Sequence, residues 1–169
     1  MQRYTLTIKA FENQSIGNGD KMSKYVGVVN ELLVETFNDI LQIEMQALKE
    51  GVLNDLSITE IHTIDAIGMY QYRTMTEVSQ DLKITLGTLT TAINRLLKKG
   101  YVDRKRGEED RRSVMIALTR KGKLAYRIHD KFHSHMVHAT IDGLNDEEEE
   151  ILIKSLEKLN NFFKEKYKL

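Results

Sequence analysis

The sequence lacks cysteine, proline and tryptophan, and it has no apolar run of the roughly 18 residues that a membrane-spanning helix needs. Without cysteine there is neither a disulfide framework nor a thiolate nucleophile, as expected in a reducing cytoplasm. Without proline, glycine and capping residues must mark the helix ends, which favours long helices. A nucleophile elbow, a phosphate-binding loop and a C-x-x-C pair are also missing. We therefore expect a cytoplasmic, largely helical protein that is not an enzyme.

The chain also lacks an excess of charge, because 25 Lys and Arg balance 25 Asp and Glu. The distribution is uneven, however. Residues 73–127 contain 14 Lys and Arg against 6 Asp and Glu, a net charge of +8, so the rest of the chain carries −8. Clustered positive charge attracts a polyanion such as DNA, although a solvated basic face is the alternative.

Apolar residues recur every three or four positions in several segments, which is the spacing of amphipathic helices. This spacing predicts helices over residues 25–50, 57–70, 74–82, 85–99, 119–142 and from 145 onward. Ser57, with Glu60 three positions later, forms an expected capping box, Thr119 and Asn145 are expected N-caps, and Gly100 is an expected C-cap.

A helix-turn-helix followed by a hairpin is predicted in the middle of the chain. Only residues 83 and 84 join the helices 74–82 and 85–99, which is the spacing of a helix-turn-helix. Residues 101–105 and 113–118 read as two strands joined by a basic loop. The expected fold class is therefore all-α with a small β-wing, a winged helix-turn-helix, preceded by an N-terminal extension over residues 1–21.

The helix 85–99 presents a polar surface opposite its apolar side. Small hydroxyl side chains let a helix enter the major groove deeply, and amide and guanidinium groups reach base edges or phosphates. A merely solvated face is the alternative. The candidate DNA-binding residues here, called the reading face below, are Thr85, Gly87, Thr88, Thr91, Asn94, Arg95 and Lys98.

The loop between the two predicted strands supplies further cations that can reach phosphates or a minor groove. The candidate DNA-binding residues of this hairpin are Arg104, Arg106, Arg111 and Arg112. Asp110 would repel phosphate, so we assign it a scaffold role, in which it orients Arg112 through a bidentate pair.

Residues 110–122, Asp-Arg-Arg-Ser-Val-Met-Ile-Ala-Leu-Thr-Arg-Lys-Gly, resemble the wing signature D-x-R-x-x-x-x-x-L-T-x-x-G of the MarR family of bacterial regulators. Residues 96–102 are similar to the end of that family's recognition helix and its first strand. The resemblance implies a homodimer that reads a palindromic double-stranded DNA operator. It assigns residues 22–50 and 119–169 to dimerisation helices and residues 51–118 to the DNA-binding lobe.

The last helix supports a dimer independently, because it has a broad apolar side that a partner subunit would cover. A core within one chain is the alternative. The residues on this side are Leu144, Ile151, Leu152, Leu156, Leu159, Phe162 and Phe163.

Residues 62–65 and 85–91 are similar to the FabT-type repressors of fatty-acid-synthesis genes in Firmicutes. This resemblance implies acyl-acyl carrier protein as corepressor. A long-chain acyl ligand needs an apolar tunnel, although aliphatic stripes at helical spacing more often form core. The candidate effector-pocket residues are Phe37, Leu41, Met45, Ile64, Ile67, Ile128 and Phe132.

Histidine suggests a rival effector. His129 and His133 lie four positions apart on one helix, so both rings face the same side and can share a metal ion. Together with Glu44 and His62, they resemble the ligand set of the zinc-sensing MarR regulators of streptococci. A hydrogen-bonded polar cluster or a lid on the ligand pocket is the alternative to zinc.

Three hypotheses follow: a ligand-responsive DNA-binding repressor, a metal-responsive one, and a helical protein-interaction module without DNA affinity. We favour the first.

Overall fold

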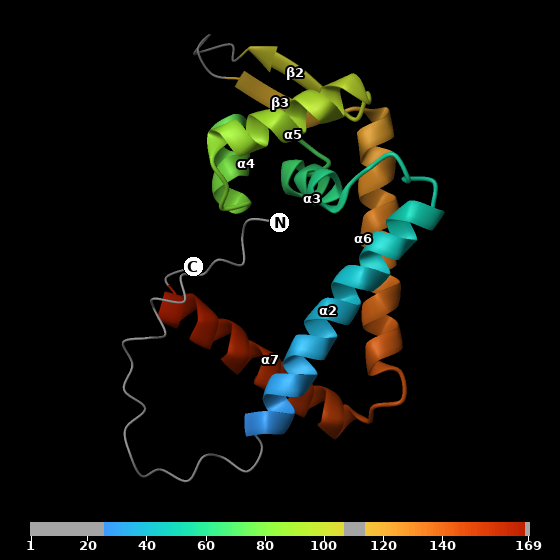
Figure 1. Ribbon diagram of the computed structural model, residues 1–169, viewed down its shortest axis with the longest axis vertical. Helices are drawn as coiled ribbons and strands as arrows, with labels where there is room; N and C mark the ends of the chain where they lie inside the picture. The colour runs from blue at the N-terminus through green and yellow to red at the C-terminus, as the bar shows by residue number, and fades with distance from the viewer. Residues whose placement is uncertain (1–25, 107–113, 168–169) are drawn as a thin grey trace. The chain divides into compact units, whose positions relative to one another are not determined.

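The structure is a computed structural model that describes residues 26–106 and 114–167 (Figure 1). In chain order, its elements are α2 (Val26–Glu50), α3 (Ile58–Ile67), β1 (Arg73–Thr74), α4 (Met75–Asp81), α5 (Leu86–Lys98), β2 (Val102–Arg106), β3 (Val114–Leu118), α6 (Arg120–Ile141) and α7 (Asp146–Tyr167). The predicted fold class, helical with a small β-wing, is confirmed. The predicted extension, residues 1–21, lies outside the described residues.

The helices begin where short polar side chains satisfy the first free backbone N–H groups. Ser57 and Glu60 form the predicted capping box of α3, and Thr74 forms another with Glu77 at the start of α4. Thr119 accepts from the N–H of Gly122, as its predicted capping role requires. The side-chain oxygen of Asn145 likewise accepts from the N–H groups of residues 147 and 148 at the start of α7.

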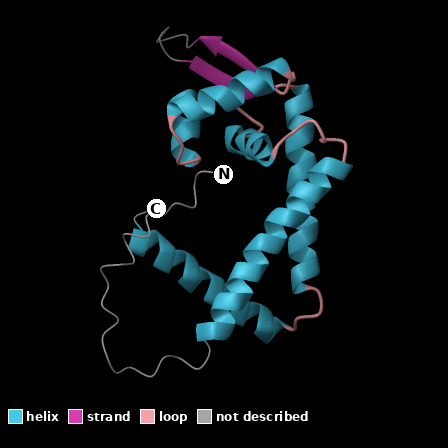
Figure 2. Cartoon of the chain, in the orientation of Figure 1, coloured by secondary structure: helices cyan, strands magenta, loops and turns pink. Residues whose placement is uncertain are grey.

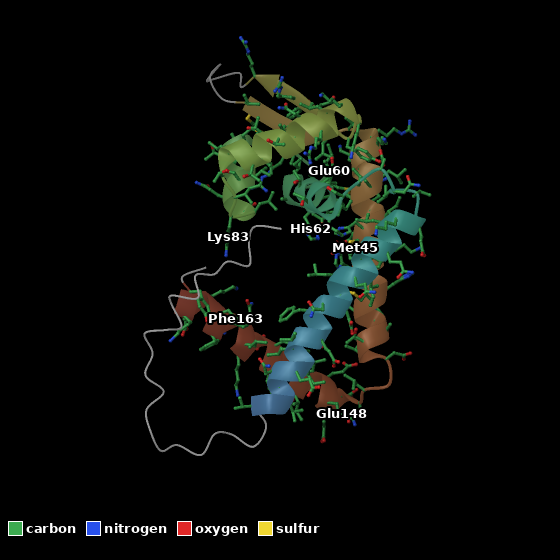
Figure 3. The ribbon with its side chains drawn as sticks, viewed as in Figure 1. Met45, Glu60, His62, Lys83, Glu148 and Phe163 are labelled. Atoms are coloured by element: carbon green, nitrogen blue, oxygen red, sulfur yellow. The ribbon has the colours of Figure 1, made fainter. Side chains whose placement is uncertain are left out.

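Two helices end in the same way. After α5, Gly100 has φ 76°, its N–H donates to the Leu97 carbonyl at 3.1 Å, and the next N–H donates to Leu96 at 2.9 Å. This is a Schellman motif in which Lys99 is the C-cap and Gly100 is the left-handed residue after it, so the predicted capping role of Gly100 is confirmed. The turn after α4 repeats the pattern with Lys83 at φ 51°, a conformation that sequence alone did not indicate for a lysine (Figure 3). Helix α3 stops at Ile67, three residues earlier than predicted, because Gly68 follows with φ 73°.

The sheet is antiparallel with the strand order β1-β3-β2. The predicted hairpin is present (Figure 2). Each strand starts one residue later than predicted, and Val102 pairs with Leu118. Strand β1 was not predicted, because its two residues are too few to show an alternating pattern. It pairs through Arg73 with Ile116 and ties the start of α4 to the wing.

The chain divides into two compact units, residues 1–47 and 48–169. In the second unit, α3, α4, α5 and the sheet enclose an apolar core that also includes Ala125 of α6. Ile64 and Ile67, which were predicted to line an effector pocket, are 0% and 1% exposed and belong to this core. Burial of each such side chain contributes about 1.5 to 3 kcal/mol. Among the described helices, none has the length and apolar character to cross a bilayer.

Candidate nucleic-acid interface

Helix α5 has one buried side and one exposed side. Leu89, Ala92, Ile93 and Leu96 are buried against the core, whereas Leu97 is only half-buried. Every residue of the reading face is exposed. The fold therefore uses one side of this helix for packing and leaves a polar side with a cationic end in solvent.

The threonine hydroxyls of α5 are bonded to their own helix. Thr85 caps the helix by accepting from the N–H of Thr88, and their two hydroxyl oxygens lie 2.9 Å apart. The hydroxyls of Thr90 and Thr91 donate to carbonyls one turn earlier, at 2.7 and 3.1 Å. These local bonds leave oxygen lone pairs and methyl groups at the surface, which suits contact with a DNA groove.

Gly87 is not required by the packing of the chain. A Cβ atom built at this position would have Thr85 Oγ1, at 3.9 Å, as its nearest contact. Helix α5 begins one residue earlier, so alanine would also suit the backbone. A glycine that the fold does not need, on an exposed polar face, points to close approach by another molecule.

The wing contributes Arg104 and Arg106, which are both exposed on β2. Arg104 lines a cleft of about 400 Å³ together with Asn94 of α5 and residues at the start of α4. The predicted loop residues Asp110, Arg111 and Arg112 lie outside the described residues, so their roles stay predictions.

Among the described residues of the basic segment, residues 73–127, at least three cations form ion pairs within the second unit. Arg73 donates to the Ala66 carbonyl at 2.7 Å and lies 2.7 Å from the Asp81 carboxylate. Lys99 and Lys121 pair with acidic groups that precede the basic segment in sequence. Sequence reasoning missed the roles of Lys99 and Lys121 because their partners are 39 and 66 positions away along the chain.

The structure brings His62 of α3 together with His129 and His133 of α6. The two α6 Nε2 atoms are 3.1 Å apart, and the ring of His62, which is labelled in Figure 3, is centred 5.8 Å from that of His129. His129 is 3% exposed, and its Nδ1 lies 2.8 Å from an oxygen of Asp65, a neighbour that sequence reasoning did not assign. Glu44, the fourth predicted ligand, is a buried residue of α2 in the first unit.

The other predicted effector residues are spread over two helices. Phe37, Leu41 and Met45 are exposed on α2 in the first unit, whereas Ile128 and Phe132 are half-buried on α6 in the second. An effector pocket made by these residues stays a prediction.

Comparisons with known proteins agree on one class of protein. A family model described as transcriptional regulator SarA/Rot matches residues 47–127. The HTH-type transcriptional regulator SarZ of Staphylococcus haemolyticus is 31% identical over 133 residues, which are 78% of this chain and 87% of that protein. The structure of Streptococcus pneumoniae FabT in complex with DNA has a TM-score of 0.79 and 44% identity, over 82% of this chain and 97% of that one. A MarR protein of Peptoclostridium difficile shares the fold, with a TM-score of 0.68 and 22% identity over 89% of this chain and 97% of its own.

Proposed function

Because the chain belongs to the MarR/SarA type of winged-helix transcriptional regulators, we propose that it is a cytoplasmic repressor that binds a palindromic DNA operator as a homodimer. Helix α5 would enter the major groove through the reading face, and the wing would contact phosphate or the minor groove. The observation that carries this proposal is the exposed polar and cationic side of α5, with a glycine that the fold does not require.

The homodimer is supported by apolar side chains that the single chain leaves in solvent. On α2, Val29 is 51% and Phe37 is 56% exposed; on α7, Ile151 is 64% and Phe162 is 51% exposed. Apolar patches of this kind mark protein contact surfaces, and a second copy of the chain is the partner that closed symmetry provides.

The regulated genes are proposed to be those of fatty-acid synthesis, with acyl-acyl carrier protein as corepressor. The support is the resemblance of residues 62–65 and 85–91 to FabT-type repressors, together with 44% identity to the FabT that was solved with DNA. In the first unit, the exposed apolar side chains of α2 supply surface for an acyl chain.

The DNA-binding surface is tested by Gly87→Ala. We expect the affinity for operator DNA, selected from random duplexes by the wild-type protein, to fall about 10- to 100-fold, because the added methyl group holds α5 away from the base edges. The free energy of unfolding should stay unchanged or rise by up to about 1 kcal/mol, since alanine favours the helix. Fluorescence anisotropy and thermal unfolding measure the two quantities. Wild-type affinity for operator DNA in this variant would refute the assignment of α5 to the DNA interface.

A second candidate is a zinc-responsive repressor, and the histidine geometry favours it. Two nitrogen ligands of tetrahedral zinc lie about 3.3 Å apart, close to the 3.1 Å between the Nε2 atoms of His129 and His133. The carboxylate of Asp65 beside the other ring nitrogen of His129 is the outer partner that metal-binding histidines usually have. His62 and Glu44 would complete the set. Bound zinc would supply a fixed link among these side chains.

The two effectors are separated by one operator-binding assay run with zinc, with a chelator, and with long-chain acyl-acyl carrier protein against the unacylated carrier. For the fatty-acid repressor, we expect only the acylated carrier to change operator affinity. A zinc effect that is lost in His129→Ala and in His133→Ala, but kept in His135→Ala, would establish the metal candidate instead. His135 is the matched control because it is exposed on the same helix.

A further inference from the structure

The C-terminal end of α5 is held by a group of polar side chains outside the reading face. We call it the Lys99 hub, and it consists of Asp55, Glu60, Lys99, Tyr101 and Lys121. The Lys99 ammonium donates to both carboxylate oxygens of Glu60, at 2.9 and 2.7 Å, and to the backbone carbonyl of Asp55. The Glu60 side chain is 4% exposed and that of Lys99 is 31% exposed, so this pair is largely shielded from water.

Asp55 connects the Lys99–Glu60 pair to Tyr101, which precedes β2, and to Lys121 in the first turn of α6. One carboxylate oxygen accepts from the Tyr101 hydroxyl at 2.6 Å, and the other lies 3.4 Å from the Lys121 ammonium. Lys121 also donates to the Lys99 carbonyl at 3.0 Å, and its ammonium lies 3.9 Å from the centre of the Tyr101 ring. The hub therefore connects the segment before α3, the end of α5, the start of β2 and the first turn of α6.

The protonation states suit this arrangement at neutral pH. Burial raises the pKa of Glu60, but hydrogen bonds from Lys99 and from the Ser57 N–H lower it more, so its pKa lies below its ordinary value. Burial also raises the pKa of Asp55, and the bonds from Tyr101 and Lys121 again lower it overall. Burial and the bond to Asp55 raise the pKa of Tyr101, which stays a neutral donor. The two carboxylates thus stabilise the fold fully at a pH above their ordinary pKa values. This stabilisation is lost as the pH falls through their lowered pKa values in the folded protein.

Hydrogen bonds to backbone carbonyls also connect the residues after α5 to the start of α6. The Thr119 hydroxyl donates to the Gly100 carbonyl at 2.7 Å, and its N–H donates to the Tyr101 carbonyl at 3.0 Å. The end of α5 therefore has side-chain and backbone bonds to the start of α6, which leads away from the sheet (Figure 1).

We propose that the Lys99 hub is a positioning device for DNA recognition, which locks the end of α5 to the start of α6 so that the two helices move as one body. Lys99 fixes the angle at which α5 meets the groove, and its ammonium does not contact phosphate. Its neighbour Lys98 is exposed and belongs to the reading face. The inference rests on the proposed function, because the angle of α5 matters only if α5 reads DNA.

The matched pair Lys98→Met and Lys99→Met tests the proposal, because both substitutions remove one charge and keep a long side chain. Affinities for the selected operator and for random duplex DNA are measured against salt, well below the melting temperature. For Lys98→Met, we expect the slope of log affinity against log salt to fall in magnitude by about 1, with the preference for operator retained. For Lys99→Met, we expect an unchanged slope and a preference for operator reduced at least about tenfold, because nonspecific phosphate attraction remains.

Two further variants keep the test decisive if Lys99→Met folds poorly. Tyr101→Phe removes only the hydroxyl that bonds Asp55, and it should also lower the preference for operator over random DNA. In Lys99→Arg the guanidinium can pair with Glu60, so this variant should restore that preference. A slope that falls by about 1 in Lys99→Met, or an unchanged preference in Lys99→Met and Tyr101→Phe, would overturn the proposal. Failure of the proposed function would be seen separately, as a wild-type protein that binds operator and random DNA equally.

Discussion

Replacing Gly122 by alanine is expected to lower the free energy of unfolding by about 3 kcal/mol or more, because backbone overlap costs at least as much as severe overpacking of a core. A Cβ atom at this position would lie 2.1 Å from the Tyr101 carbonyl oxygen and 3.2 Å from Leu118 Cβ. The obstacle is backbone, and the same oxygen accepts the bond from Thr119, so it cannot move without opening the joint between β2 and α6.

The measurement is thermal unfolding at a fixed protein concentration, since the melting temperature of the proposed dimer would depend on concentration. A loss of about 3 kcal/mol should lower the melting temperature by roughly 6 to 12 °C. Gly87→Ala is the matched control, because it adds the same methyl group where the nearest atom, Thr85 Oγ1, is 3.9 Å away. A melting temperature of Gly122→Ala equal to that of the wild type within error would contradict the close approach of Gly122 to the Tyr101 carbonyl oxygen.

Replacing Arg95 and Arg112 together by alanine is expected to lower operator affinity about 100- to 10,000-fold. Each arginine that contacts a base or a phosphate contributes roughly 1 to 3 kcal/mol, and contributions from separate sites add. Arg95 is exposed at the cationic end of the reading face, and Arg112 belongs to the wing signature. Each single substitution should lower affinity about 10- to 100-fold.

The assay is a salt-controlled titration of operator DNA, with size-exclusion chromatography to show that the oligomeric state is that of the wild type. Arg127→Ala is the control, because this arginine lies in the same basic segment, is exposed, and comes from α6 outside the reading face. Wild-type affinity in both single variants would refute the assignment of α5 and the wing. An equal loss in Arg127→Ala would point to general charge rather than to these two contacts.

Residues 73–127 show which part of the DNA-binding surface the composition could predict and which part it could not. A net charge of +8 over residues 73–127 correctly indicated DNA binding, as the family membership shows. It did not say which cations face outward. Arg73, Lys99 and Lys121 are paired with Asp81, Glu60 and Asp55, so they add little to the attraction for phosphate. The reading face was predictable because the period of a helix sets which side is polar, whereas the pairing of charges depends on packing.

The sequence by itself determined the helices, their caps, the hairpin and the glycine at the end of the wing signature. These features depend on residues within about four positions of each other, where backbone geometry leaves few arrangements. Only the tertiary structure showed strand β1, the left-handed conformation of Lys83 and the carboxylate of Asp65 beside His129. It also showed that Gly122 is needed because the Tyr101 carbonyl oxygen lies where a Cβ atom would be. It also decided the Lys99 hub, whose side-chain partners are 39, 46 and 66 positions apart. Such contacts form only after the core has brought the elements together, and no local pattern records them.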